Sequence, residues 1–350
     1  MSAPRGSVVL RVALIAGVVC ASGCVFSAKS RQARHDAQIH RQQHEEAADR
    51  NTDSKADTSA RVKQAQHEVS LRQLQAQLAA RGDPDSLAAS ALFEGLLSGF
   101  TSAVSLDLAG RSVAGAPNRA DLAFVQLQLC ESAPGCDAAP LELRLRQLDP
   151  ENGITWTYQL VRADRANDGP TWRRAREGLA QSRRIDLYWN KIVSHLASAV
   201  AGKAGFDSTT AAMELLGIES SFTPAFEPVS RACSVEDIQQ PDVLDKCRRI
   251  AASFRNADTT LFEAYGSSLA IRLWPEESSE HQQIATERRG LRYRVELMTV
   301  NAKRVNSERA RKTLAGLIGR YPTEQTAYRA LFVDLGLVPD PPANWTEHSP

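Results

Sequence analysis

Residues 148–156 read Leu-Asp-Pro-Glu-Asn-Gly-Ile-Thr-Trp, and residues 81–87 read Arg-Gly-Asp-Pro-Asp-Ser-Leu. In both stretches an Asp-Pro pair stands between two apolar segments. Aspartate before proline is typical of a helix start, because proline in the first turn gives up no helical hydrogen bond. Gly82 is typical of a helix end, so each stretch predicts a short connection between two successive helices.

The same pattern of helices extends over most of the chain. Further helices are expected to begin at Asp149 and Pro170, and the Gly- and Ser-containing stretch through Pro117 is expected to be a connection. Strand signals are scarce, since the single Asn-Gly pair, at 152–153, falls at a helix start. The sequence therefore predicts an all-α fold, with other helices over 87–97, 120–130, 137–148, 185–201, 208–216, 241–254, 259–274, 276–304, 307–318 and 324–335.

The N-terminus has the features of an export signal. Arg5 and Arg11 are followed by an apolar run over 12–19, which is too short to span a bilayer, and then by Ala21-Ser22-Gly23-Cys24. This last segment resembles the lipobox of bacterial lipoproteins, although Ala21 stands where leucine is commoner. The resemblance implies that Cys24 is acylated after removal of residues 1–23, and Val25 favours sorting to the outer membrane. An ordinary secretory signal, which would leave a soluble periplasmic or secreted protein, is the alternative.

Composition separates a polar tether from a folded body. Residues 24–58 contain few apolar side chains and are expected to form a flexible spacer ahead of an α-helical body over 59–350. His35, His40 and His44 lie in this spacer and could bind a soft divalent metal on a transient helix, but a polar spacer without a metal is the simpler interpretation. The whole chain has 42 Lys and Arg against 41 Asp and Glu, so its charge does not indicate a nucleic-acid partner.

Four cysteines remain once Cys20 is removed with the signal and Cys24 is used for lipid. An even number in an exported chain predicts two disulfides, and three pairings are possible. Local pairing of Cys130 with Cys136 and of Cys233 with Cys247 is favoured, because each pair flanks an expected interhelical loop. Neither pair has CxxC spacing or a neighbouring histidine, so we expect no zinc site.

Two resemblances bear on the fold. Residues 75–165, with the two Asp-Pro stretches, resemble tetratricopeptide-like helical hairpins, although a strict 34-residue repeat is absent. The whole body is similar to uncharacterised exported helical proteins of gamma-proteobacteria, through both cysteine pairs and the ending from Gly336-Leu337-Val338-Pro339 to Trp345. These resemblances imply an irregular helical-hairpin array and an exported compartment, and they imply no activity.

A short motif suggests one enzymatic alternative. Residues 217–224 read Gly-Ile-Glu-Ser-Ser-Phe-Thr-Pro and resemble the Glu-Ser-x-Phe segment of lytic transglycosylases. The resemblance implies that Glu219 is a general acid acting on peptidoglycan, since a carboxyl in an apolar pocket can hold a proton at neutral pH. However, residues 231–239 lack the glycines and methionine that follow this segment in that family. A helix end followed by a Ser/Pro loop explains the motif equally simply.

Other constellations are weaker. His195 and His281 are the candidate bases of the folded region, besides His67 and His348, but no Gly-x-Ser-x-Gly, Walker or His-Glu-x-x-His motif accompanies them. We expect His195 to be a core or groove histidine. The arginines at 173, 174, 176, 183 and 184, and those at 288, 289, 292 and 294, are expected on solvated helix faces. The tryptophans at 156, 172, 189 and 274 are expected in the core, and Trp345 is expected to dock on the body.

These observations favour a non-enzymatic binding or scaffold module of the cell envelope. Stacked helical hairpins leave a concave face that commonly binds a protein partner, and no cofactor is expected. The alternative is a peptidoglycan-cleaving enzyme that uses Glu219. Exposure of Glu219 in a cleft would favour the enzyme, and burial would favour the binding module.

Overall fold

The computed structural model describes residues 61–346. The signal peptide, Cys24, the tether with His35, His40 and His44, and His348 lie outside this range. Residues 61–81 are helical, and no strand occurs between 61 and 346. The remaining elements are α2 (Pro84–Ser98), α3 (Ala103–Gly115), α4 (Ala120–Ser132), α5 (Ala139–Leu148), α6 (Ile154–Arg165), α7 (Gly169–Gln181), α8 (Trp189–Val200), α9 (Ser208–Glu219), η1 (Ser220–Phe222), α10 (Glu227–Ala232), η2 (Asp237–Gln239), α11 (Pro241–Arg255), α12 (Thr260–Ala270), α13 (Ser279–Val300), α14 (Ala302–Val305), α15 (Glu308–Ile318) and α16 (Glu324–Asp334).

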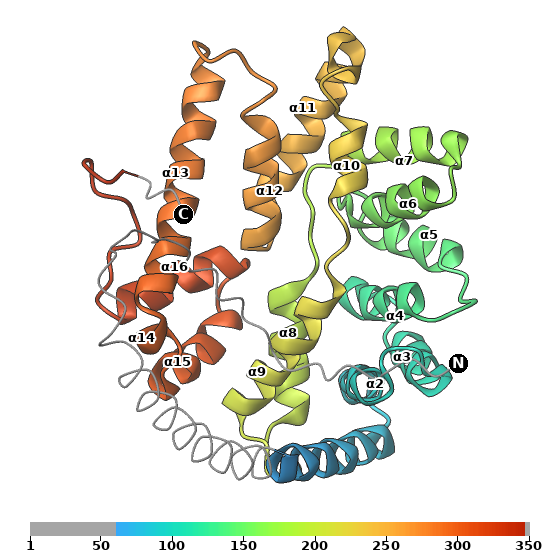
Figure 1. The fold of residues 1–350 in the computed structure, drawn as a ribbon. Coiled ribbons are helices and arrows are strands. Elements are labelled where there is room, and N and C mark those ends of the chain that lie inside the picture. The colour runs from blue at the N-terminus through green and yellow to red at the C-terminus, as the bar shows by residue number, and fades with distance from the viewer. Residues whose placement is uncertain (1–60, 347–350) are drawn as a thin grey trace, which may run out of the picture. The chain divides into compact units, whose positions relative to one another are not determined.

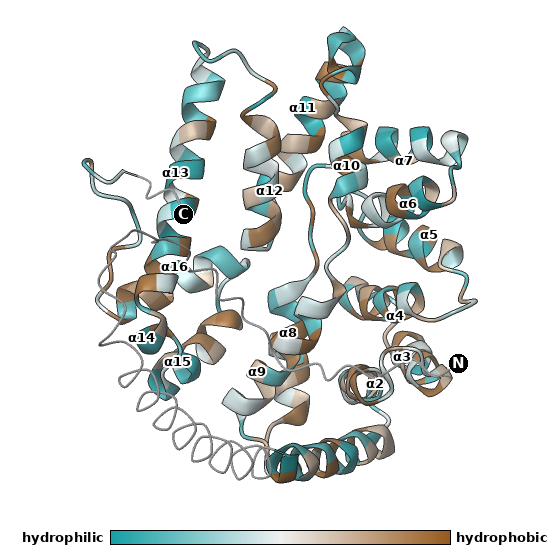
Figure 2. Cartoon of the chain, in the orientation of Figure 1, coloured by the Kyte–Doolittle hydropathy of each residue, from teal (hydrophilic) through white to brown (hydrophobic). Residues whose placement is uncertain are grey.

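Gln66–Glu347 form one compact unit, and of the other unit only residues 61–65 are described. The unit has one continuous apolar core, whose largest fully buried side chains include Phe93, Phe124, Phe254 and Phe262. In contrast, α13 is largely hydrophilic along its length (Figure 2) and buries few of its residues. The all-α prediction is confirmed for the described residues.

Neighbouring helices pack in chain order from α2 to α7, as α2 on α3, α3 on α4 and so on (Figure 1). Later elements then return to this series: α8 contacts α2 and α4, α10 contacts α6, and α11 contacts α7. The helices α15 and α16 pack on each other, and α15 also contacts α8 and α9. The fold is thus a sequential series of hairpins held together by contacts between distant parts of the chain.

The first Asp-Pro stretch lies at a helix start as its sequence predicts, whereas the helix expected to begin at Asp149 begins only at Ile154. Asp83 caps α2 by accepting a hydrogen bond from the backbone N–H of Ser86 at 3.0 Å, and Pro84 occupies the first turn. Gly99 ends this helix in the left-handed conformation, with φ of 75°. A side-chain oxygen that accepts a backbone N–H is worth about 1 kcal/mol at such a position, and Asp168, Asp207, Ser278, Ser307 and Thr323 cap later helices in the same way.

The prediction of a connection before Pro117 was wrong, because residues 103–115 form helix α3. Its small residues pack closely against α2, where Ser105 and Ser112 donate hydrogen bonds to the carbonyl oxygens of Ala91 and Pro84, both at 2.7 Å. Serine and glycine have weak helix propensity, but these tertiary contacts satisfy the serine hydroxyls and override it.

The helix predicted over 185–201 starts four residues late, at Trp189. Residues 185–188 are not helical, and Tyr188 has a positive φ of 55°. The reason is tertiary, since side chains from two other loops bond the backbone of this segment, as described below. The predicted helix over 259–274 likewise ends at Ala270, and the one over 276–304 divides at Asn301 into α13 and α14.

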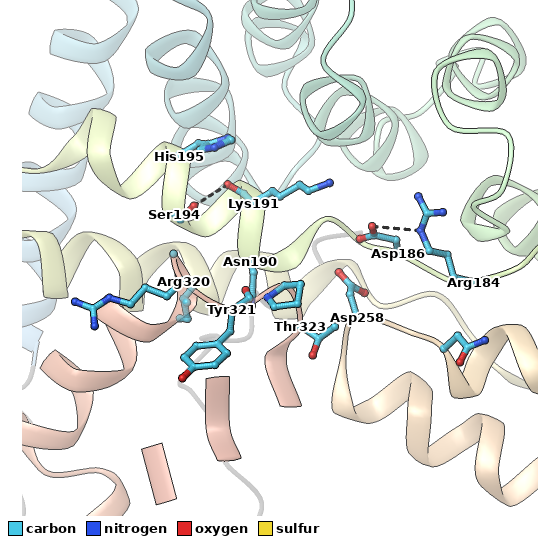
Figure 3. Close-up of a pocket in the computed structure, with 14 residues that line it drawn as sticks. Arg184, Asp186, Asn190, Lys191, Ser194, His195, Asp258, Arg320, Tyr321 and Thr323 are labelled. Carbon is cyan, nitrogen blue, oxygen red and sulfur yellow. Dashed lines mark hydrogen bonds and ion pairs between the residues drawn. The ribbon is translucent and has the colours of Figure 1, made fainter. Parts of the chain in front are cut away.

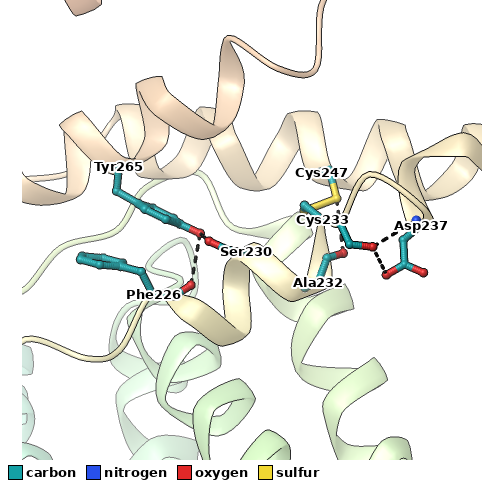
Figure 4. Close-up of a disulfide and its surroundings, with 8 residues drawn as sticks. Phe226, Ser230, Ala232, Cys233, Asp237, Cys247 and Tyr265 are labelled. Atoms are coloured by element: carbon teal, nitrogen blue, oxygen red, sulfur yellow. Dashed lines mark hydrogen bonds between the residues drawn. A yellow bond between two sulfur atoms is a disulfide. The ribbon is translucent and has the colours of Figure 1, made fainter.

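Both disulfides join the cysteines that local pairing predicts. Cys130 bonds Cys136 across the α4–α5 connection, and Cys233 bonds Cys247. The second disulfide ties the end of α10 to α11 (Figure 4). At the other end of α10, the ring of Phe226 stacks on Tyr265, whose hydroxyl lies 2.9 Å from that of Ser230. The short helix α10 is therefore held at both ends.

The C-terminal segment docks on α13, as predicted for Trp345. The indole N–H of Trp345 donates to Glu296 at 3.2 Å, and its ring meets the edge of Tyr293. Arg289 donates to the carbonyl oxygens of Pro342 and Trp345 at 2.7 and 2.9 Å. Separately, none of the helices between residues 61 and 346 combines the length and the apolar character needed to cross a bilayer.

Candidate functional site

A cavity of about 500 Å³ opens where three parts of the chain meet. They are residues 184–195, with the first turns of α8, the α11–α12 connection, and the α15–α16 connection. The charged and titratable side chains on its wall are Arg184, Asp186, Lys191, His195, Asp258, Arg320 and Tyr321 (Figure 3). Its volume falls in the range typical of small-molecule sites, about 300–1,000 Å³.

Asp258 organises one end of this cavity. Its side chain is 7% exposed, and its two carboxylate oxygens accept the backbone N–H groups of Leu187 and Trp189, both at 3.0 Å. Its own N–H donates to the carbonyl oxygen of Ile185 at 3.2 Å. These bonds hold residues 185–188 out of the helix that their sequence favours.

The same residue also contacts the third segment. The backbone N–H of Glu324 donates to the carbonyl oxygen of Asp258 at 2.8 Å, and the Glu324 carboxylate accepts from the N–H of Thr260 at 2.7 Å. Asp258 therefore links the start of α8, the start of α12 and the start of α16. We call this meeting point the Asp258 junction.

Asp186 lies beside Asp258, within hydrogen-bonding reach of its carboxyl. Burial raises the pKa of Asp258 well above its ordinary value, and the negative charge of Asp186 raises it further. The two backbone donors act in the opposite direction and are outweighed. One proton on this pair relieves the repulsion of two adjacent carboxylates.

Asn152, from the Asp-Pro stretch over 148–156, binds the backbone of Asp186 at the Asp258 junction. Its side-chain oxygen accepts the N–H groups of Ile154 at 3.1 Å and Asp186 at 2.9 Å, and its amide donates to the carbonyl oxygen of Asp186 at 2.8 Å. The neighbouring Asp149 accepts from Arg184 and from the Tyr188 hydroxyl, each at 2.7 Å. The Asp-Pro-Glu-Asn stretch thus positions one wall of the cavity as well as starting a helix.

Two cations on the wall lack a carboxylate partner among residues 61–346. Lys191 projects from α8 and lies 5.6 Å from the ring of Tyr188, and Arg320 is exposed on the α15–α16 connection. Arg184, in contrast, is paired with Asp149 and Glu151. The wall therefore carries more positive than negative charge that is available to a ligand.

His195 stands at the edge of the cavity, so the prediction of a groove position describes it better than a core position. Its side chain is 48% exposed. Nδ1 lies 2.8 Å from Nη2 of Arg119 and 3.4 Å from the carboxylate of Asp121. Because arginine can only donate, neutral His195 accepts at Nδ1 and carries its hydrogen on Nε2.

Glu219 is enclosed in the protein interior. It ends α9, is 3% exposed, and accepts one hydrogen bond from the Gln128 amide at 3.1 Å. Burial raises its pKa to about 7, and the Gln128 bond opposes that rise only in part. The raised pKa fits the sequence argument for a general acid, but a substrate has no access to a carboxyl in this position.

A second cavity, of about 360 Å³, shares the segment next to the Asp258 junction. Leu187, Trp189, Leu261, Phe262 and Val295 make most of its wall apolar. This cavity lies against α12 and α13. None of the charged groups of the first cavity line it, and its own charged lining residue is Glu324. It offers van der Waals contact and few directional groups.

The tryptophans and His67, which the sequence also singles out, contact neighbouring side chains of the protein. Trp156, Trp172, Trp189 and Trp274 pack partly buried against the core, and three of them lie under the arginines at 146, 176 and 248. His67 lies 3.4 Å from Glu214. No cluster of three or more metal-ligating side chains occurs within residues 61–346.

Four charged residues of the cavity wall were not predicted from the sequence: Asp186, Lys191, Asp258 and Arg320. The signal at Asp258 is local, since an aspartate just before Thr259-Thr260 and an apolar run is typical of a helix start. Nothing in the spacing links it to residues 186–191, which are about 70 positions away. Comparison of the chain with models of protein families, with curated proteins and with solved structures finds no significant match.

Proposed function

We propose that this protein is a non-enzymatic binding module of the bacterial envelope, and that the cavity at the Asp258 junction is its binding site. The observation that supports this proposal best is the pair of cations, Lys191 and Arg320, that line an open cavity without a carboxylate partner in the described part of the chain. Unpaired charges on a polar wall are available to a ligand. In contrast, Arg184 is paired with carboxylates, and Asp258 is bonded to backbone N–H groups.

The proposed location is the periplasmic side of the outer membrane, with a lipid on Cys24 as anchor and residues 24–58 as tether. The two disulfides support an oxidising compartment, because such bonds are rare in the cytosol. Replacing Cys24 with Ser should release the protein from membranes into the periplasmic fraction. Unchanged membrane association of that variant would contradict the lipid anchor.

We also propose that the disulfides stabilise the fold. The 15-residue ring closed by Cys233 and Cys247 is worth about 3 kcal/mol in the chain-entropy model. Mild reduction of the native protein should therefore lower its melting temperature by several degrees. An unchanged melting curve would contradict this structural role.

We further propose that the body is an irregular array of tetratricopeptide-like hairpins and shares its ancestry with the exported helical proteins that it resembles. The packing of α2 to α7 in chain order supports this proposal. Arrays of this kind commonly bind protein partners along one helical face. A protein partner at the cavity is therefore the expected physiological ligand class.

A photo-crosslinking residue at position 191 tests the binding function in intact cells. A discrete crosslinked product at 191, lost when Arg320 is changed to Gln, would support a binding site at the cavity. The matched control places the same residue at Lys303, which is exposed on α14. Equal crosslinking at 191 and 303 would contradict a specific site.

The enzymatic alternative is a lytic transglycosylase that uses Glu219, and its motif is the observation in its favour. A general acid must reach the glycosidic oxygen of its substrate, so the burial of Glu219 argues against this role. Incubating the full-length protein with purified peptidoglycan and analysing the fragments by mass spectrometry decides the matter. Anhydro-sugar products that disappear in the Glu219→Gln variant would establish the enzyme and overturn our proposal.

A further inference from the structure

We propose that the second cavity, of about 360 Å³ beside α12 and α13, is a separate binding site for a small uncharged apolar molecule. This site goes beyond the binding function proposed for the first cavity and does not depend on it. The apolar wall of the cavity, the apolar side chains exposed at it, and the bonded state of its polar groups all favour such a ligand.

The wall of the second cavity presents both buried and exposed apolar surface. Leu187 and Phe262 are buried, and Trp189 is partly buried. Leu261 and Val295 line the same cavity and are 52% and 47% exposed. A ligand that covers these side chains would remove apolar surface from water, which is favourable in proportion to the area covered.

The two exposed side chains come from neighbouring helices. Leu261 lies in the first turn of α12 and Val295 lies on α13, which packs against α12. Because α13 is largely hydrophilic along its length (Figure 2), an exposed valine at a cavity is unlike the rest of its surface. Exposed apolar groups that gather at one site indicate binding more strongly than scattered ones do.

The polar groups of the wall are largely bonded within the protein. The hydroxyls of Ser220 and Thr223 donate to the carbonyl oxygens of Gly217 and Ser220, at 2.7 and 3.4 Å. The Glu324 carboxylate accepts the backbone N–H of Thr260 at 2.7 Å. A ligand therefore meets few groups that require a polar partner, and apolar contact dominates.

The charge of the wall disfavours an ionic ligand. Glu324 lines the cavity, whereas no lysine, arginine or histidine between residues 61 and 346 does so. An anion would be repelled by Glu324, and a cation would lose its hydration in a mostly apolar wall. Burial raises the pKa of Glu324, so these surroundings already oppose an ionised group. An uncharged ligand avoids the cost of burying a charge.

The Asp258 junction fixes this wall in place. Each of its three segments supplies neighbouring residues to the two cavities, which are Asp186 and Leu187, Asp258 and Thr259, and Thr323 and Glu324. Backbone hydrogen bonds from Glu324 to Asp258 and from Asp258 to Ile185 join the segments. The second cavity is therefore largely formed before a ligand enters, as is usual for small-molecule sites.

Photolabelling of the full-length chain in detergent tests the proposal. The probe is phenyl(trifluoromethyl)diazirine, a small uncharged aromatic molecule that yields a reactive carbene in light, and mass spectrometry of peptides locates its adducts. We expect saturable labelling of residues that line the second cavity. The same probe with a carboxylate on its ring should label these residues about tenfold less or weaker still, because its charge must lose its hydration.

Leu261→Asp and Val295→Asp place a carboxylate in the wall at exposed positions. Labelling of the cavity should fall about tenfold or more in each variant, since the added charge must be desolvated when the probe enters. Ala264→Phe fills the cavity without adding charge and should also reduce labelling. Leu143→Asp and Val300→Asp are the matched controls, because both side chains are exposed and neither lines the cavity. Circular dichroism melting checks that each variant is folded.

Labelling spread over the protein surface without saturation would overturn the proposal, as would equal losses in the cavity and control variants. Equal labelling by the two probes would contradict an uncharged ligand. The crosslink at position 191 reports on the first cavity, so its presence or absence tests the proposed binding function separately.

Discussion

Glu219 and Asp258 are both buried carboxyl residues, but their surroundings differ in kind. Glu219 accepts one hydrogen bond, from the side chain of Gln128, and its other oxygen has no partner in the described structure. Asp258 accepts two backbone N–H groups, contacts Asp186, and borders a cavity. The first acid terminates a helix in the interior, and the second connects three segments of the chain.

This difference shows that a raised pKa alone does not identify a functional acid. Burial raises the pKa of both groups, yet only Asp258 lies where a ligand has access. The number of backbone donors is more informative, because each N–H that Asp258 accepts would be left buried without a partner if the carboxyl were removed. Removing the Asp258 carboxyl should therefore lower the free energy of unfolding, because both backbone N–H groups lose their acceptor. Ionisation of Glu219 should also lower the free energy of unfolding, because its charge is buried.

Replacing Asp258 with Ala should have the largest effect. The change leaves the N–H groups of Leu187 and Trp189 without acceptors, and each such loss costs about 1–3 kcal/mol. We expect a loss of about 3 kcal/mol in the free energy of unfolding, measured by urea denaturation. Asp340→Ala, which removes an exposed partner of Arg329, should change it by less than about 1 kcal/mol. Equal effects of the two substitutions would contradict a stabilising role for the backbone hydrogen bonds of Asp258.

Replacing Asn152 with Ala tests the opposite side of the junction. The buried amide makes three hydrogen bonds to the backbone, two of them with Asp186, so its loss should cost about 2 kcal/mol. Asn256→Ala is the control, because that exposed amide donates a single long bond to the carbonyl oxygen of Arg183. A result for Asn152 no larger than for Asn256 would mean that Asp258 holds residues 185–188 in their non-helical conformation without Asn152.

Glu219→Gln should stabilise the protein at alkaline pH. The folded-state pKa of Glu219 is raised to about 7 from 4.5, so its favourable contribution is fully present below about pH 4.5 and is lost as the pH rises through 7. Glutamine stays neutral and fills the same space. The variant should therefore exceed the wild type by about 1–3 kcal/mol at pH 8 and by little at pH 5. A stability difference that does not vary with pH would contradict the buried, titrating carboxyl.

Gln128→Leu should have the smallest effect on stability, and its signature is the pKa of Glu219. The Gln128 amide is the hydrogen-bond donor that lowers this pKa, so its removal should move the value above about 7. Carboxyl ¹³C chemical shifts across a pH titration measure the change. A fall in the pKa would indicate that water enters the space left by the amide. That outcome would contradict the description of Glu219 as closed off from solvent.

Much of the helical architecture could be predicted from the sequence, because its signals are local. Asp83-Pro84 lies at the start of α2 as expected, and the disulfides join nearby cysteines, although α6 begins five residues after Asp149. The errors occur where distant residues compete with local propensity. Ser105 and Ser112 make α3 a stable helix through α2, and Asn152 and Asp258 keep residues 185–188 out of α8.

The candidate site could not be predicted for the same reason. Its residues come from positions 186, 191, 258 and 320, and each looks like an ordinary polar residue in its local sequence. The motif around Glu219 was visible because it is contiguous, and its contiguity says nothing about access to solvent. Only the three-dimensional arrangement separates a buried helix end from a cavity wall.

The Asp258 junction has a consequence for the order in which the chain assembles during synthesis. The hairpins from α2 to α7 consist of neighbours in sequence and can form as each pair of helices is released, since local contacts close quickly. Asn190, in contrast, donates to the carbonyl oxygen of Tyr321, across 131 residues. The cavity is therefore completed only when the last tenth of the chain has been synthesised, so a translation product that stops before Ile318 would carry the hairpins and lack one wall of the cavity.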